Sequence, residues 1–179
     1  MRKTTINKTV LSALFLALGF VLPFFTGQIP QIGKMLLPMH IPALLCGFIC
    51  GPTFGLSVGF IMPLCRSVIF NMPQLYPTAI AMAFELGAYG LISGIVYKTL
   101  HKKTLISTYI ALVSAISGGR VAWGIAMCVI LGVHKNGFTF SAFITSAFAT
   151  ALPGIALQLI VIPVVMIFLN RFRLIEAKE

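Results

Sequence analysis

Long apolar runs with almost no charge constrain this chain more than any other feature of its sequence. Hydrophobic residues make up 59% of its 179 residues, and charged residues only 9%. So few charges cannot cover the surface of a soluble domain, whereas a run of about 20 apolar residues can cross a bilayer as a helix. The sequence therefore predicts an all-α integral membrane protein that forms a single domain over residues 1–179.

Turns rich in glycine, proline and charge divide the chain into six apolar segments. The second segment is short for a span, carries Pro42 in its first turn and ends at a Gly51-Pro52 turn. We expect transmembrane helices at about residues 9–25, 40–51, 54–70, 78–100, 105–131 and 140–169.

The basic residues between these segments indicate how the helices are oriented. Nine of them fall at the two termini and in the loop after the fourth segment, and only Lys34 and Lys135 fall in the loops on the other side. By the positive-inside rule, this asymmetry predicts six spans with both termini in the cytoplasm. The net charge of +10 therefore reflects membrane topology, and we expect a lipid bilayer around the chain and no nucleic-acid partner.

Three ionisable side chains, Arg66, Glu85 and Arg120, fall inside apolar segments. A charge at membrane depth costs a few kcal/mol, so it usually faces a cavity, a partner or a substrate. All three are expected in the outer half of the bilayer or near its midplane. Their net positive charge and the planar fork of arginine suit a ligand with one carboxylate. Alternatively, Glu85 and one arginine form a structural ion pair, although two arginines sharing one carboxylate fit that reading less well.

Further polar residues favour a pocket that opens outward. The outer loops supply most of them, whereas the inner turn at 51–53 offers almost none, and an open channel needs polar groups along its full length. The candidate mouth residues are Gln28, Gln31, Lys34, Asn71, Gln74 and Tyr76. Further along the chain, Trp123 is expected either to line the pocket or to be an ordinary packing residue between helices. His40 is expected as a hydrogen-bonded cap, and Gln158 as one side of an interhelical hydrogen bond.

Motifs for catalysis are absent from the sequence. It holds no Walker motif, no HExxH and no GxSxG. We therefore expect no catalytic residues, no metal site and no ATP hydrolysis by this chain itself.

One short motif and two longer stretches carry a resemblance to a known family. Ala13 and Ala17 form an AxxxA motif in the first apolar segment. The longer stretches are LPMHIPALLCGFICGPTFGLSVGFIMPLCRSVIF, from Leu37 to Phe70, and YPTAIAMAFELGAYGLISG, from Tyr76 to Gly94. With these features the chain resembles the S components of energy-coupling factor (ECF) transporters, and their pantothenate-type members in particular.

The resemblance implies a vitamin-binding subunit in a bacterial cell membrane. Such a subunit joins a transmembrane T component and two ABC ATPases, which use ATP and Mg while the S component itself binds no cofactor. It implies that Ala13 and Ala17 dock on the T component and that loop residues Gln28, Gln31 and Lys34 belong to a gate over the pocket. It also implies that Arg66 or Arg120 meets the vitamin carboxylate.

The remaining candidate residues are expected to contact the polar groups of the vitamin. Asn71, Gln74, Tyr76 and Glu85 would meet its hydroxyl and amide groups. The alternatives are an S component for folate, hydroxymethylpyrimidine, pyridoxine or cobalamin, or a membrane protein that takes no part in transport.

Overall fold

The computed structural model describes residues 2–26, 35–100, 104–133 and 150–171, and these residues form helices without any strand. The 3-10 helix η1 (Leu22–Thr26) extends α1, and the π-helical turn η2 (Leu75–Ala79) precedes α5. The α-helices are α1 (Arg2–Val21), α3 (His40–Cys50), α4 (Pro52–Phe70), α5 (Ile80–Thr99), α6 (Leu105–Val133) and α8 (Leu152–Arg171).

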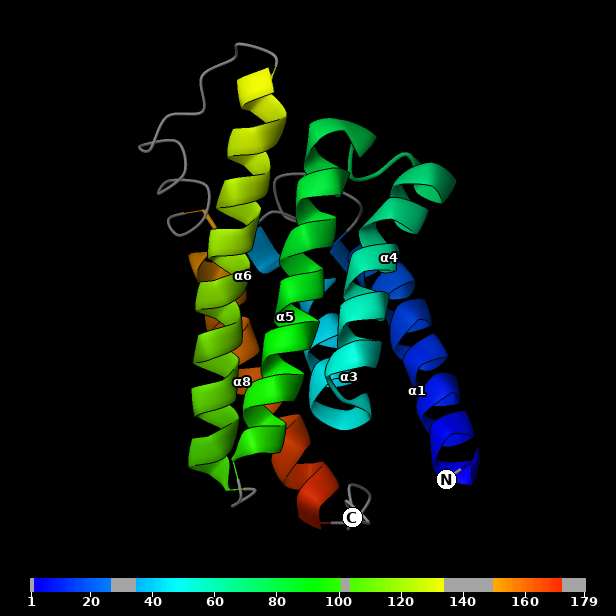
Figure 1. Ribbon diagram of the computed structural model, residues 1–179, viewed down its shortest axis with the longest axis vertical. Coiled ribbons are helices and arrows are strands. Elements are labelled where there is room, and N and C mark those ends of the chain that lie inside the picture. Colours follow the sequence, from blue (N-terminus) through cyan, green and yellow to red (C-terminus); the bar gives the residue numbers. More distant parts are fainter. Residues whose placement is uncertain (1, 27–34, 101–103, 134–149, 172–179) are drawn as a thin grey trace.

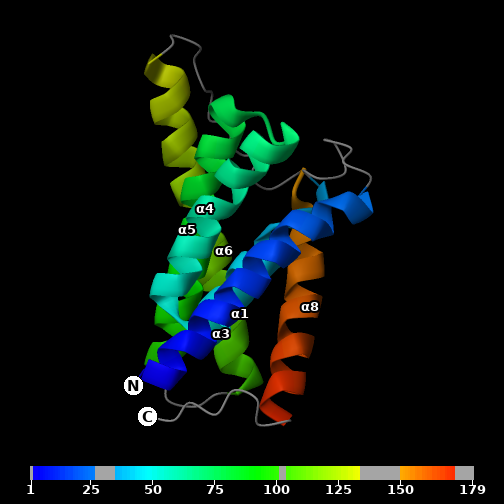
Figure 2. The ribbon, with the colours of Figure 1, turned by 90° about the vertical axis from the view of Figure 1, so that its right-hand side faces the viewer.

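The helices form a bundle in which α1 begins and α8 ends at the same end of the molecule, here called the termini end (Figure 1). α5 lies at the centre and packs against α3, α4 and α6, while α8 packs against α6 and α3. Figure 2 shows α1 crossing the bundle obliquely, with α4 and α5 on one side of α1 and α8 on the other. This arrangement brings α3, α5 and α6 together in the interior, where Glu85 and Arg120 are buried.

Glycines let α4 and α5 approach each other closely. A Cβ at Gly90 would collide with the Gly55 carbonyl, and a Cβ at Gly59 would collide with the Leu86 carbonyl. Backbone contact of this kind is the usual way for helices to associate in lipid, where no hydrophobic force drives them together. Gly51 has another role, because its φ of 100° allows the tight turn between α3 and α4.

The short helix α3 determines where the interior becomes polar. Its 11 residues are about 16 Å long at 1.5 Å per residue, roughly half the thickness of a hydrocarbon core. Because α3 starts in mid-bundle, its first residue, His40, lies buried at depth, where the His40 backbone N–H donates to the Leu37 carbonyl. The chain from Met35 to Met39 therefore passes through the bundle ahead of α3.

The observed helices agree with the expected segments at most boundaries. Within the described residues, five helices are long and apolar enough to cross a membrane, and α3 is a shorter apolar helix. The first helix starts at Arg2, earlier than the expected residue 9, because the polar residues before it continue the same helix. The first part of the expected sixth helix, residues 140–149, lies outside the described residues. Six crossings and a cytoplasmic location of the termini remain predictions.

Two alanine substitutions on α5 test the close contact with α4. We expect Gly90→Ala to lower the Tm of the purified protein, because overpacking against the Gly55 carbonyl costs about 1–3 kcal/mol. Gly87→Ala is the matched control, since the nearest atom to its Cβ would be the flexible end of the Leu56 side chain, at 3.3 Å, and alanine favours the helix. Equal Tm values for the two variants would contradict this account of the interface.

Candidate functional site

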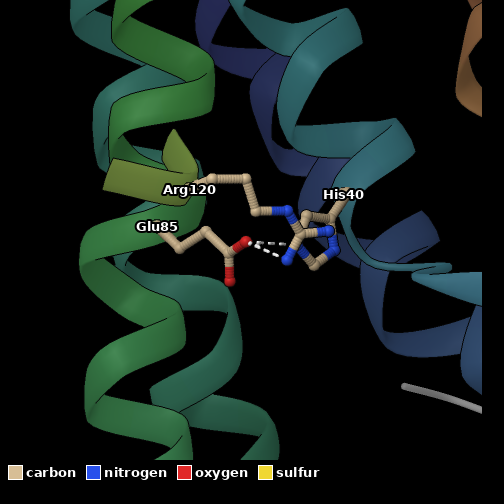
Figure 3. Close-up of polar contacts among 3 residues, drawn as sticks. All are labelled: His40, Glu85 and Arg120. Atoms are coloured by element: carbon tan, nitrogen blue, oxygen red, sulfur yellow. Dashed lines mark ion pairs between the residues drawn. The ribbon is translucent and has the colours of Figure 1, made fainter. Parts of the chain in front are cut away.

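Three buried ionisable side chains meet inside the bundle: Glu85 from α5, Arg120 from α6 and His40 from α3 (Figure 3). Glu85 Oε1 lies 2.8 Å from Arg120 Nη1 and 3.5 Å from His40 Nε2. The second contact is an ion pair only when His40 is protonated. Oε1 contacts both groups without good hydrogen-bond angles, so the attraction is mainly between charges.

Local sequence explains why these three helices meet here. Gly119 precedes Arg120, and a Cβ at Gly119 would lie 3.0 Å from the Tyr89 ring and 3.2 Å from the Glu85 carbonyl. The lack of a side chain thus brings the backbone of α6 against the turn of α5 that carries Glu85. The His40 ring packs edge-on against Tyr89, with ring centroids 5.1 Å apart.

The cluster lies deep in the bundle and at one level. Counted from the termini end at about 1.5 Å per residue, Glu85 lies about 21 Å along α5 and Arg120 about 22 Å along α6. Both side chains are almost fully buried, at 3% and 4% exposure. An ion pair this far along two apolar helices avoids leaving either charge unpaired in the interior, where an unpaired charge is expensive.

Several buried polar atoms, at the ion pair and on α8, have no hydrogen-bond partner among the described residues. They are Nε and Nη2 of Arg120, Nδ1 of His40, the hydroxyl of Tyr89 and both amide atoms of Gln158. Buried polar groups are usually paired, and each unpaired group costs about 1–3 kcal/mol. The interior therefore has hydrogen-bonding capacity that the described protein groups leave unused. The interhelical hydrogen bond expected for Gln158 is not found in this part of the chain.

Arg66 makes its contacts outside this cluster, although the sequence predicted that all three charged residues face one pocket. Arg66 Nη1 donates to the Phe20 carbonyl at 2.6 Å, near the end of α1. Its guanidinium stacks against Phe24 and Phe70, each with its ring centroid 5.2 Å away. The negative end of the α1 dipole and the two aromatic faces stabilise the buried cation.

The residues expected at the mouth of the pocket lie at the end opposite the termini end. Asn71 caps α4 in the left-handed conformation and is exposed, as is Gln74. Tyr76 donates a hydrogen bond from its hydroxyl to the Ile130 carbonyl at 3.1 Å and so ties this segment to α6. Trp123 is half-buried, one turn from Arg120 on α6. The gate residues Gln28, Gln31 and Lys34 lie outside the described residues.

The AxxxA motif faces away from the bundle. Ala13 and Ala17 are exposed on α1, whereas Ser12 and Phe15 point inward and are buried. Elsewhere on the surface, a shallow depression of about 240 Å³ lies on α4. Leu64, Cys65, Val68 and Ile69 line it, so it offers no partner for a charged ligand.

Apolar helices around a buried polar centre define a multi-pass α-helical membrane protein. The profile of one family, described as "ECF transporter, substrate-specific component", matches residues 7–166, and the chain belongs to this family. Searches of curated proteins and of solved structures find no match. Members of the family are substrate-binding subunits in the cell membrane. They bind a small-molecule vitamin and join a T component and ATPases.

A double-mutant cycle tests the central ion pair. We expect Glu85→Gln and Arg120→Gln each to cost about 3–5 kcal/mol of stability, because each leaves one buried charge without its partner. The double variant should recover much of that loss, since its interior is neutral. Equilibrium unfolding in a mild detergent measures the coupling, and additive losses would show that the pair does not interact energetically.

Proposed function

We propose that this chain is the vitamin-binding S component of an ECF-type importer and that its vitamin is pantothenate. The free edge of Arg120 carries the proposal. Glu85 holds Nη1, while Nε and Nη2 are buried without a partner among the described residues. This edge of a guanidinium has the geometry to receive a carboxylate through two parallel hydrogen bonds.

The charge of the cluster supports a ligand with a single carboxylate. Arg120 and Glu85 together are neutral, and a protonated His40 would bring the cluster to +1. A carboxylate bound to Arg120 would then leave the buried site neutral, which limits the desolvation cost. Folate carries more negative charge, whereas pyridoxine and hydroxymethylpyrimidine lack the carboxylate that this edge would receive.

Residues toward the opposite end of the bundle complete the proposed binding site. We assign Trp123 to its wall and Asn71, Gln74 and Tyr76 to its mouth, on the support of their positions on α4, η2 and α6. The shared end of α1 and α8 supports six crossings, and the basic residues there support a cytoplasmic location for both termini (Figure 1).

Vitamin titrations distinguish the two arginines. We expect the neutral double variant Glu85→Gln/Arg120→Gln to bind pantothenate at least about tenfold more weakly than the wild type, because charge-assisted hydrogen bonds are lost. Arg66→Gln should bind within about threefold of the wild type, since the contacts of Arg66 are to Phe20, Phe24 and Phe70 and not to the cluster. Isothermal titration with a panel of vitamins measures both. Tight binding by the double variant, or wild-type preference for another vitamin, would overturn the assignment.

The exposed alanines on α1 are the proposed docking face for the T component. We expect Ala13→Trp and Ala17→Trp to abolish co-purification of the T component and ATPases while vitamin binding is kept, because bulk there prevents close helix packing. Leu18→Trp is the matched control, since Leu18 is also exposed but lies about 140° round the helix from Ala13. Loss of assembly in the control alone would place the docking face elsewhere on α1.

A further inference from the structure

Gln158 is a buried polar side chain whose amide forms no hydrogen bond within the described residues. It is fully buried in α8, and neither its amide nitrogen nor its amide oxygen has a partner among the described residues. It belongs to a buried ridge on α8 at four-residue spacing, which comprises Gly154, Gln158, Ile162 and Met166. A leucine would fill this position without the cost of an unpaired amide.

The ridge faces the segment that leads to His40. α8 packs against α3 and α6, and a Cβ at Gly154 would lie 2.5 Å from the Met35 carbonyl. Gln158 lies one turn beyond Gly154, about 6 Å further along α8. A Cβ at Gly154 would also meet the side chain of Leu37, which lies one turn before His40. Gln158, one turn further along the same ridge, therefore lies toward the start of α3.

Two other groups beside the ion pair are also unpaired in the described part of the chain. They are Nδ1 of His40 and the hydroxyl of Tyr89, and both side chains are at most 1% exposed. The imidazole and the phenol ring contact each other, as described above. An amide and a phenol can each donate or accept a hydrogen bond, whereas the guanidinium of Arg120 and a protonated His40 can only donate.

We propose that Gln158, Tyr89 and His40 form a second ligand subsite beside the carboxylate site of Arg120, and this rests on the proposed function. The subsite takes a ligand group that both donates and accepts hydrogen bonds, such as a hydroxyl or an amide. The ligand class is therefore a small carboxylic acid that also carries hydroxyl or amide groups. Gln158 selects for that second group, because only such a group satisfies both ends of its amide.

One substitution separates the ligand role of Gln158 from a structural one. We expect Gln158→Leu to leave the Tm of the ligand-free protein unchanged or raised, because it removes an unpaired buried amide without changing the volume much. The same variant should bind pantothenate about tenfold more weakly or worse. Ile162→Leu, one turn along the same ridge, is the matched control and should bind like the wild type.

Each result of this experiment has a distinct meaning. A Tm clearly lowered in Gln158→Leu would show that the amide has a structural partner and would overturn the subsite. Unchanged pantothenate affinity in Gln158→Leu would overturn the subsite while leaving the proposed function intact. If the wild type binds no member of the vitamin panel, the proposed function fails, and the subsite that rests on it fails as well.

Discussion

The ion pair between Glu85 and Arg120 is the interaction on which the interior of this protein depends. Lipid offers neither water nor counter-ions, so each charge needs the other at 2.8 Å to remain buried at mid-bundle. The pair in turn requires α5 and α6 to approach closely, which the glycine before Arg120 permits. α3 begins at His40, and this residue contacts the same carboxylate oxygen. The start of the short helix is therefore part of the cluster.

The two arginines have different surroundings, and this suggests different tasks. Arg120 pairs with a carboxylate and keeps one edge of its fork free. Arg66 directs its guanidinium to a backbone carbonyl and two aromatic rings, which join α1 to α4. A lysine could not make these contacts in the same way, since it lacks the planar group that stacks while it donates. Arg66 thus fixes the end of α1, and these contacts offset the cost of burying its charge.

Most of the fold could be predicted from the sequence, because hydropathy and turn residues mark helices directly. The burial of Glu85 and Arg120 could be predicted for the same reason. The position of Arg66 could not, because its partners lie 46 positions away at Phe20 and in a 3-10 turn that no local pattern indicates. His40 and Gln158 received ordinary structural roles, since a single polar residue in an apolar run does not show what it faces. Only the packing of the helices showed that His40 reaches Glu85 and that the amide of Gln158 is buried without a partner in the described chain.

α1 is attached to the bundle by its inward face, while its outward face is exposed. Its inner face is held at one end by Arg66 and nearer the other end by Ser12, whose hydroxyl lies 3.6 Å from the thiol of Cys46. From Val10 to Val21 its exposed residues are small or aliphatic. A helix fixed to the bundle on one side can offer a smooth surface on the other without moving the buried site. Docking and ligand binding can therefore be altered separately, because the residues proposed for each lie on opposite sides of α3 and α4.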